Sequence, residues 1–209
     1  MGKKRIRDFG IVPGRVKTGE RNAITDVPGV RVGHCTVKTE ENHTGVTVIV
    51  PGPDNAFAKH YTAAAYIHNG FGKSAGVVQV EELGTLETPI ALTNTLNVGK
   101  VLDAMVEIVI EQCRKDGIEP QSINPVVGEC NDCRINHIQK RAIGEKEVRE
   151  AFAAASEEFE EGDVGAGAGT TCYGMKGGIG SASRVITIGE KEYTIGVLVQ
   201  SNFGATKDF

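Results

Sequence analysis

A glycine-rich segment near the C-terminal end most constrains how this chain can fold. Eight glycines lie between Gly162 and Gly180, in the run GDVGAGAGTTCYGMKGGIG. Each glycine raises the entropy cost of ordering the backbone, so this density suits neither a helix nor an ordinary strand. Such a segment is favoured where the backbone packs very closely against another element, or where its N–H groups line a pocket.

Size and charge predict one domain and argue against two classes of partner. The 209 residues suit a single domain, so we expect residues 1–209 to form one. The net charge of −4 gives no sign of a surface for nucleic acid or membrane. The basic cluster KKRIR at residues 3–7 is expected to be a solvated tail.

Targeting signals and cysteine usage predict a cytoplasmic protein. No apolar run approaches the ~20 residues needed to span a bilayer, and no signal peptide is visible. The five cysteines are an odd number, which favours reduced thiols over a disulfide framework.

The hydrophobic pattern predicts several strands and two helices. We expect strands over residues 30–37, 45–50, 75–80, 89–94 and 125–129, and a hairpin formed by 184–188 and 193–200. One helix is expected over 97–116, capped by Asn97 and ended by Gly117, and another over 145–160 with an acidic outer face. Because strands come in runs, we predict an α+β fold with helices layered on a mixed or mainly antiparallel sheet.

Nucleotide binding is one alternative for the glycines. Gly72-Lys73-Ser74 could end a phosphate-binding loop, but Ile67 stands where that loop needs its first glycine. Residues 70–75 fit a looser G-x-G-x-x-A pattern, yet an apolar strand-like run follows them where a helix should begin. The pattern therefore disfavours nucleotide binding.

Metal and redox chemistry are also disfavoured. Cys130 and Cys133 form a C-x-x-C pair, with His137 four residues further on. A structural zinc site usually needs a second ligand pair, and none is present. We interpret the two cysteines as partly buried thiols. The five histidines are scattered, and no catalytic triad can be assembled from the chain.

Six stretches in order give the chain a family resemblance. It resembles the large α segment of the DmpA-like aminopeptidases of peptidase family S58, which include the β-peptidyl aminopeptidases. The stretches are NAITDVPGVRVGH (22–34), TGVT (44–47), TPIALTNT (88–95), VVGECND (126–132), residues 165–184 and GVLVQSNFG (196–204).

The resemblance implies a four-layered α/β/β/α sandwich of the DmpA type, similar in appearance to the Ntn hydrolases but with different connectivity. Ornithine acetyltransferases share this architecture. The resemblance also implies a precursor that cuts itself into an α and a β segment. The first residue of the β segment is then a serine that serves as the nucleophile, or a threonine in the acetyltransferases.

Three site residues follow from the resemblance. Asn202 is similar to the asparagine that donates to the oxyanion, a catalytic role. Glu129 is similar to the carboxylate that binds the free α-amine of the substrate. Asn131 falls where some relatives carry a tyrosine that supports the intermediate, so it is a substrate-binding candidate with a changed side chain.

We therefore expect residues 1–209 to be the α portion of a serine-type aminopeptidase that acts on short peptides, amides or esters. The cleavage point in relatives lies beyond the QSNFG motif, and this chain ends at Phe209 before reaching it. The expected partners are the β segment and further αβ units in a homo-oligomer, and no metal or organic cofactor is implied. The alternatives are an acyltransferase of the ornithine acetyltransferase type and a non-catalytic small-molecule binding domain.

Overall fold

A computed structural model describes residues 4–208, so Lys3 of the basic cluster and Phe209 lie outside the described residues. Four strands form the main sheet, in the order β1-β2-β5-β6. They are β1 (Arg31–Lys38), β2 (His43–Val50), β5 (Ile90–Asn94) and β6 (Val126–Cys130). The pairs β1–β2 and β2–β5 are antiparallel and β5–β6 is parallel, which confirms the predicted mixed sheet.

The remaining strands form three antiparallel pairs. The long hairpin consists of β9 (Ile179–Ile188) and β10 (Lys191–Gln200), and it confirms the hairpin expected around residues 189–191. The two short pairs are β3 (Tyr61–Thr62) with β4 (Thr85–Leu86), and β7 (Thr171–Cys172) with β8 (Met175–Lys176).

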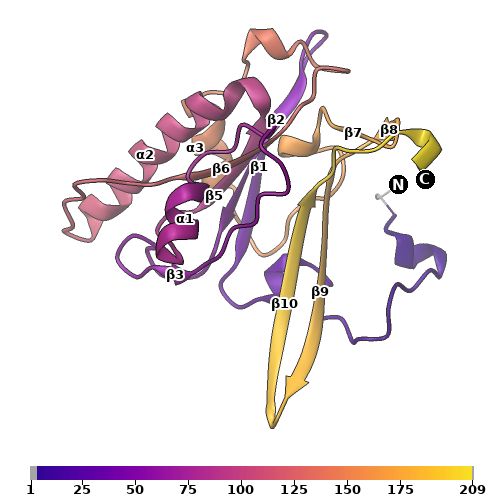
Figure 1. Ribbon diagram of the computed structural model, residues 1–209, viewed down its shortest axis with the longest axis horizontal. Coiled ribbons are helices and arrows are strands. Elements are labelled where there is room, and N and C mark those ends of the chain that lie inside the picture. The colour runs from indigo at the N-terminus through magenta and orange to yellow at the C-terminus, as the bar shows by residue number, and fades with distance from the viewer. Residues whose placement is uncertain (1–3, 209) are drawn as a thin grey trace.

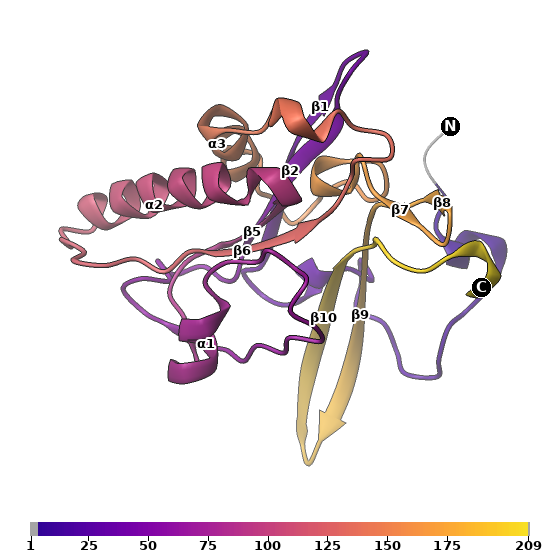
Figure 2. The ribbon, with the colours of Figure 1, turned by 45° about the horizontal axis from the view of Figure 1, so that its top comes forward.

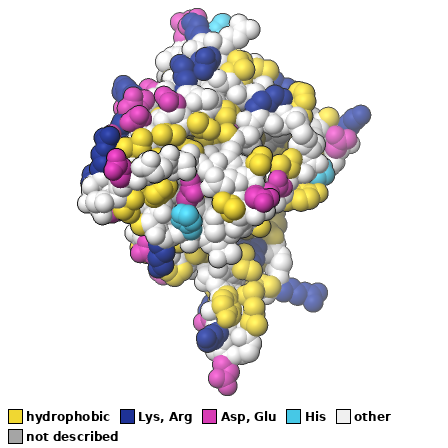
Figure 3. Space-filling view, turned by 60° about the vertical axis from the view of Figure 1, so that its left-hand side comes forward, with side chains coloured by type: hydrophobic (Ala, Val, Ile, Leu, Met, Phe, Trp, Pro, Cys, Tyr) yellow, Lys and Arg dark blue, Asp and Glu magenta, His cyan; other side chains and the backbone are white. Residues whose placement is uncertain are grey.

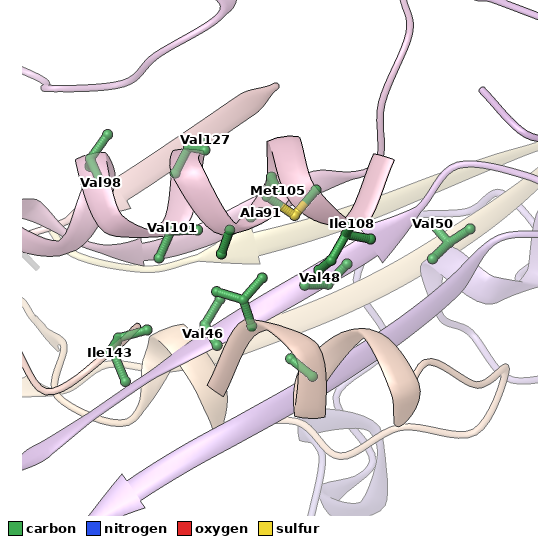
Figure 4. Close-up of a cluster of buried hydrophobic side chains, with 13 residues drawn as sticks. Val46, Val48, Val50, Ala91, Val98, Val101, Met105, Ile108, Val127 and Ile143 are labelled. Atoms are coloured by element: carbon green, nitrogen blue, oxygen red, sulfur yellow. The ribbon is translucent and has the colours of Figure 1, made fainter. Parts of the chain in front are cut away.

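Helices α2 (Val98–Lys115) and α3 (Glu145–Ala153) cover one face of the sheet, as Figures 1 and 2 show. The alternation of β2 explains why, because Val46, Val48 and Val50 all point to this face and are buried there. Figure 4 shows Val46 and Val48 on the side of β2 that faces Met105 of α2, with Val50 further along the strand. The helix-side core is Val46, Val48, Val50, Ala91, Val98, Val101, Ala104, Met105, Ile108, Val127, Ile143, Val148 and Ala151.

The β9–β10 hairpin lies on the opposite face of the sheet. Ile49, between the helix-facing valines of β2, packs with Val32 of β1, and Leu198 of β10 packs against them. Leu198 also contacts a second cluster that contains Ile179. Figure 2 shows the hairpin projecting from this side, away from α2 and α3. The chain therefore forms a helix layer, a sheet and a second β layer.

Helix α2 follows its sequence pattern closely. The residues predicted for its buried face are buried: Val101, Met105, Ile108, Val109 and Cys113. Gly117, beyond its end, has φ +71°, a conformation that glycine adopts without strain. The predicted capping residue is wrong. The side chain of Asn94 accepts a hydrogen bond from the Asn97 backbone N–H, and Asn97 makes no cap of its own.

Two predicted elements differ from the structure. The strand expected over 75–80 is wrong, because only Ala75 forms a bridge, to Val127, and helix α1 (Val77–Leu83) then begins. Gly76 between them has φ +82°, which turns the chain out of the extended conformation. The helix expected over 145–160 ends at Ala153, because Ser156 forms a β-bridge with Val32.

The basic cluster near the N-terminus is not simply a solvated tail. The guanidinium of Arg5 donates to the backbone carbonyls of Arg21, Asn22 and Ser181. It also forms an ion pair with Glu161 at 3.2 Å. Arg5 therefore ties the N-terminal segment to the β9–β10 hairpin.

The glycine-rich segment packs directly onto strand β2, as its composition predicts. A Cβ on Gly45 would lie 2.3 Å from the carbonyl oxygen of Gly165, and a Cβ on Gly165 would lie 2.4 Å from Thr47 Oγ1. Gly165 also has φ +50°. Side chains at either position would separate the two segments.

Within the described residues, no helix combines the length and apolarity that a bilayer span requires.

Candidate functional site

The carboxyl ends of three strands place the predicted site residues. Parallel pairing of β5 and β6 sets Thr93 opposite Glu129 and Asn94 opposite Cys130. The chain leaving β10 passes the same edge, where Asn202 Nδ2 donates to the backbone carbonyl of Asn131 at 2.8 Å. The structure therefore brings Asn131 and Asn202 into contact and places Glu129 two residues away along the chain.

Glu129 sits between two neutral hydrogen-bond donors. Its Oε1 accepts from the backbone N–H of Lys73 at 3.0 Å, and its Oε2 accepts a short hydrogen bond from Thr95 Oγ1. Thr95 starts the 3₁₀ turn that leads into α2, so the carboxylate lies near the positive end of that helix dipole. A carboxylate offers about four acceptor positions, and these two bonds leave room for more.

The carboxylate of Glu129 is suited to bind a positively charged ligand group. Among residues 4–208, no ion pair links Glu129 to a lysine, arginine or histidine side chain. The glycine loop that resembled a phosphate-binding loop lies against it, since a Cβ on Gly72 would be 3.9 Å from Glu129 Oε1. The carboxylate would repel a phosphate at this loop, which supports the sequence-based argument against nucleotide binding.

Asn202 presents an amide donor at the end of the hairpin. Its bond to Asn131 uses one of the two amide N–H groups. The side chain of Asn131 is folded back into its own turn, because its Oδ1 accepts from the Cys133 backbone N–H at 3.0 Å. It is therefore the backbone carbonyl of Asn131 that orients Asn202.

Cys130 is an inert thiol beside the site. Its Sγ donates to the Gln200 carbonyl at 3.6 Å, and Asn202 is a further hydrogen-bonding neighbour. Burial, followed by the charge of Glu129, raises the pKa of the Cys130 thiol to about 12. The thiol is therefore protonated at neutral pH and a poor nucleophile.

The second cysteine of the pair differs from the prediction. Cys133 is exposed, so only Cys130 matches the interpretation as a partly buried thiol. In the part of the chain that the structure describes, no three His, Cys, Asp or Glu residues are grouped as metal ligands would be.

Sequence reasoning missed three side chains that organise this edge. Thr95 binds Glu129, and Gln200 Nε2 donates to the carbonyls of Thr93 and Ala166 at 3.2 and 2.8 Å. Gln200 thus joins the hairpin, the sheet and the glycine segment at one point. Asp132, next to Asn131, is 1% exposed and accepts from Thr44 Oγ1 at 2.6 Å. These contacts link residues far apart in sequence, so no local motif signals them.

Comparison with known sequences identifies two relatives that carry the same name. Two beta-peptidyl aminopeptidases named BapA match nearly the whole chain. The one from Sphingosinicella microcystinivorans is 40% identical over 210 residues, which is 96% of this chain and 52% of that protein. The one from Sphingosinicella xenopeptidilytica is 38% identical over 214 residues, 98% of this chain and again 52% of that protein.

Solved structures share the fold at similar identity. The PH0078 protein from Pyrococcus horikoshii OT3 superposes with a TM-score of 0.94 at 43% identity, over 98% of this chain and 61% of that one. A Burkholderia sp. beta-aminopeptidase gives 0.89 at 42% identity, over 97% and 58%. The l-aminopeptidase d-ala-esterase/amidase from Ochrobactrum anthropi gives 0.88 at 34% identity, over 97% and 59%. The last is described as a variant of the Ntn hydrolase fold, which confirms the predicted fold class.

The extent of these matches settles the family. The chain spans about half the length of the curated relatives that it matches. The family described as Peptidase family S58 matches residues 22–209, and this range includes every residue of the candidate site. The chain therefore belongs to peptidase family S58.

Proposed function

We propose that the chain is the α portion of an aminopeptidase that releases N-terminal residues from short peptides, amides or esters. It acts together with a second segment of the same precursor, which carries a serine nucleophile at its own N-terminus. Relatives described as beta-peptidyl aminopeptidases and as an l-aminopeptidase d-ala-esterase/amidase support this class of activity. The single observation that carries the proposal is the carboxylate of Glu129, which neutral donors hold at the same edge of the sheet as the amide of Asn202.

Glu129 anchors the free α-amine of the substrate. An ammonium group placed against its two oxygens forms charge-assisted hydrogen bonds, which are about twice as strong as neutral ones. The bonds from Lys73 N–H and Thr95 Oγ1 hold the carboxylate still without neutralising it. A substrate with a blocked amine presents no cation, so this contact selects for a free N-terminus.

Asn202 stabilises the tetrahedral intermediate. When the serine attacks the carbonyl carbon, the carbonyl oxygen becomes an oxyanion. The Asn202 amide donates to it, and the oxyanion replaces the weakly accepting Cys130 sulfur as the second partner of this amide. The bond to the Asn131 carbonyl fixes the amide before the reaction, so little reorganisation is needed in the transition state. The turn holds Asn131 through its Oδ1, and its side-chain Nδ2 is a further donor at the same edge that supports the bound substrate.

The serine of the second segment uses its own α-amine as the base. The amine takes the hydroxyl proton as the oxygen attacks and returns a proton to the leaving amine. Water then attacks the acyl-serine ester, passing through a second tetrahedral species that Asn202 stabilises in the same way. The released amino acid is the residue whose amine Glu129 held.

The second segment docks on the outer face of the hairpin. Tyr193, Ile195, Val197 and Val199 form a stripe along β10 in which each residue is 48% exposed. Figure 3 shows hydrophobic side chains on this projecting part of the molecule. Exposed apolar stripes of this kind mark interaction surfaces. Complete αβ units then associate into a homo-oligomer.

The test compares a free and an acetylated substrate on the protein that contains both segments. Wild-type protein is expected to hydrolyse an aminoacyl p-nitroanilide with a kcat/KM far above that for its N-acetyl analogue. Loss of the ammonium contact costs roughly 2–4 kcal/mol. Glu129→Gln should lower kcat/KM for the free amine and narrow the gap to the analogue, while Glu107→Gln on the exposed face of α2 should change neither.

Equal hydrolysis of both substrates by the wild-type protein would remove Glu129 from this role. Acyl transfer to an amino acid in place of hydrolysis, with a threonine as the first residue of the second segment, would identify an acyltransferase instead.

A further inference from the structure

Asp132 lies at the centre of a buried polar network behind the candidate site. Its Oδ2 accepts from Thr44 Oγ1 at 2.6 Å and its Oδ1 accepts from Asn136 Nδ2 at 2.9 Å. Both partners are themselves buried. Among the described residues, no cationic side chain forms an ion pair with this carboxylate.

The network joins the elements that frame the site. Asn94 Nδ2, at the end of β5, donates to Thr44 Oγ1 at 2.8 Å, so the Thr44 hydroxyl must donate onward to Asp132. On the other side, Asn136 Oδ1 accepts from Asn42 Nδ2 at 3.0 Å and from the His43 backbone N–H at 3.2 Å. On both sides, each side chain donates a hydrogen bond to the next one in the direction of Asp132. The Asp132 carboxylate accepts from both sides and donates to neither.

Asp132 also shapes the turn that follows β6. Its backbone carbonyl accepts from the N–H groups of Ile135 at 3.2 Å and Asn136 at 3.0 Å. The glycine-rich segment closes over its side chain, since a Cβ on Gly169 would lie 2.7 Å from the Cβ of Asp132 and 2.1 Å from the His43 carbonyl. The side chain and the backbone of Asp132 are therefore both fixed.

A buried carboxylate is a costly way to hold a turn. Burial raises the pKa of the Asp132 carboxyl group, and the hydrogen bonds from Thr44 and Asn136 oppose that shift. An asparagine would carry no charge to desolvate, so it would suit a merely structural turn. An ionised aspartate accepts on both oxygens with no donor of its own, and both of its neighbours here are donors. Because a donor faces each oxygen, the Asp132 carboxylate is held in one position, and we infer that the backbone next to it is held as well.

We propose that Asp132 is a positioning residue for the reaction, fixing the Asn131 carbonyl and, through it, the amide of Asn202. The inference rests on the proposed function, because it gives Asn202 the role of oxyanion donor. Asp132 is one residue from the carbonyl that Asn202 binds, so a small rotation of the turn moves the amide directly. Glu129 is held by different groups, Lys73 and Thr95, and its contact with the substrate amine should be independent.

The test is a double-mutant cycle on the protein that contains both segments, assayed with an aminoacyl p-nitroanilide. Asp132→Asn is expected to lower kcat by about tenfold or more with little change in KM, since a misplacement of about 1 Å costs up to about 100-fold. In an Asn202→Ala background the same substitution should have almost no further effect, because its target is gone. Asp26→Asn is the matched control and should leave kcat unchanged, as its carboxylate binds Ser183 in another network.

Thr44 provides a second route if Asp132→Asn does not fold. Thr44→Ser keeps the hydroxyl donor and should retain kcat, whereas Thr44→Val removes it and should lower kcat only where Asn202 is present. Equal losses in the wild-type and Asn202→Ala backgrounds would overturn the positioning role while leaving the proposed function intact. A wild-type protein that does not turn over the substrate, or an Asn202→Ala variant with unchanged kcat, would overturn the proposed function and this inference with it.

Discussion

The two faces of the main sheet are covered to different extents. On the face covered by α2 and α3, Val46, Val48 and Met105 belong to a closed core, and each is fully buried. On the other face, the hairpin packs a partly buried Leu198 against the sheet but leaves the alternate side chains of β10 about half exposed. One region is a complete hydrophobic layer, and the other presents an apolar surface outward.

This difference has a consequence for function. The candidate site residues lie at the boundary between the two regions, with Glu129 on β6 of the closed sheet and Asn202 just beyond the open hairpin. A segment that covers the hairpin would therefore reach the site at its edge. We infer that the closed region fixes substrate recognition, while the open region receives the part of the protein that performs the attack.

The largest effect is expected from a charge on the open face. Val197→Asp should abolish association with the second segment, because a buried unpaired carboxylate costs several kcal/mol. Co-purification of the two segments measures this directly. Val78→Asp on α1, where the side chain is 75% exposed, is the matched control. It should leave co-purification unchanged, because a surface substitution of this kind changes the free energy of unfolding by less than about 0.5 kcal/mol. Normal association of the Val197→Asp protein would show that the second segment does not cover this stripe of β10.

A large kinetic effect is expected at the boundary itself. Asn202→Ala should leave the assembly intact and lower kcat on an aminoacyl p-nitroanilide by about 10²–10³, the usual cost of losing one oxyanion donor. A KM close to the wild-type value would show that the substrate is still recognised. The role assigned to Asn202 does not survive a kcat near that of the wild-type protein.

A moderate effect is expected where the glycine segment meets the closed sheet. Gly45→Ala should lower the free energy of unfolding by about 1–3 kcal/mol, because the new methyl would meet backbone atoms that cannot move aside. Gly99→Ala on α2 is the control, since nothing lies within 4 Å of its added Cβ, and it should be neutral or stabilising. Chemical denaturation of the assembled protein compares them, and equal stability of the two variants would argue against close packing.

The smallest effects are expected from two carboxylates that respond to pH in opposite senses. For Asp26, burial opposes ionisation, but hydrogen bonds from Ser183 and from two backbone N–H groups outweigh it and lower the pKa below its ordinary 3.8. Its contribution to stability is then present above that value and is lost as the pH falls through the lower folded pKa. For Asp132, burial outweighs the hydrogen bonds from Thr44 and Asn136 and raises the folded pKa above its ordinary 3.8. The free energy of unfolding therefore falls as the pH rises from that value through the folded pKa, because ionising this buried carboxyl group has a desolvation cost.

Unfolding free energies measured against pH for the wild-type, Asp26→Asn and Asp132→Asn proteins separate these two contributions. Removing Asp26 should flatten the loss of stability as the pH falls below 3.8, and removing Asp132 should flatten the decline as the pH rises above 3.8. The same slope in all three proteins would contradict both assignments.

Periodic patterns in the sequence predicted the parts of the fold that depend on local burial. Helix α2 was predictable because its buried residues recur every three or four positions, and the hairpin because its strands flank a short turn. The apolar run at 75–80 has the length of a strand, and periodicity alone did not reveal that Gly76 turns the chain into a helix. The glycine content predicted that this segment packs closely against another element, but it did not show that Gly165 approaches strand β2.

The site could be predicted only in part, because its contacts join distant segments. Glu129 and Asn202 were identified through the family resemblance and not through any local pattern. Thr95 is separated from Glu129 by 34 residues and Thr44 from Asp132 by 88. Such partners emerge only when β5 and β6 pair and the glycine-rich segment closes over them.

Whether the hairpin face needs a partner is tested by making residues 1–209 alone and together with the second segment. Size-exclusion chromatography and thermal unfolding report association and cooperativity. The isolated chain is expected to aggregate through its open hairpin face, and the two segments together are expected to elute as one assembly with cooperative unfolding. A chain 1–209 that is monomeric, soluble and cooperatively folded by itself would contradict the claim that this face requires a partner.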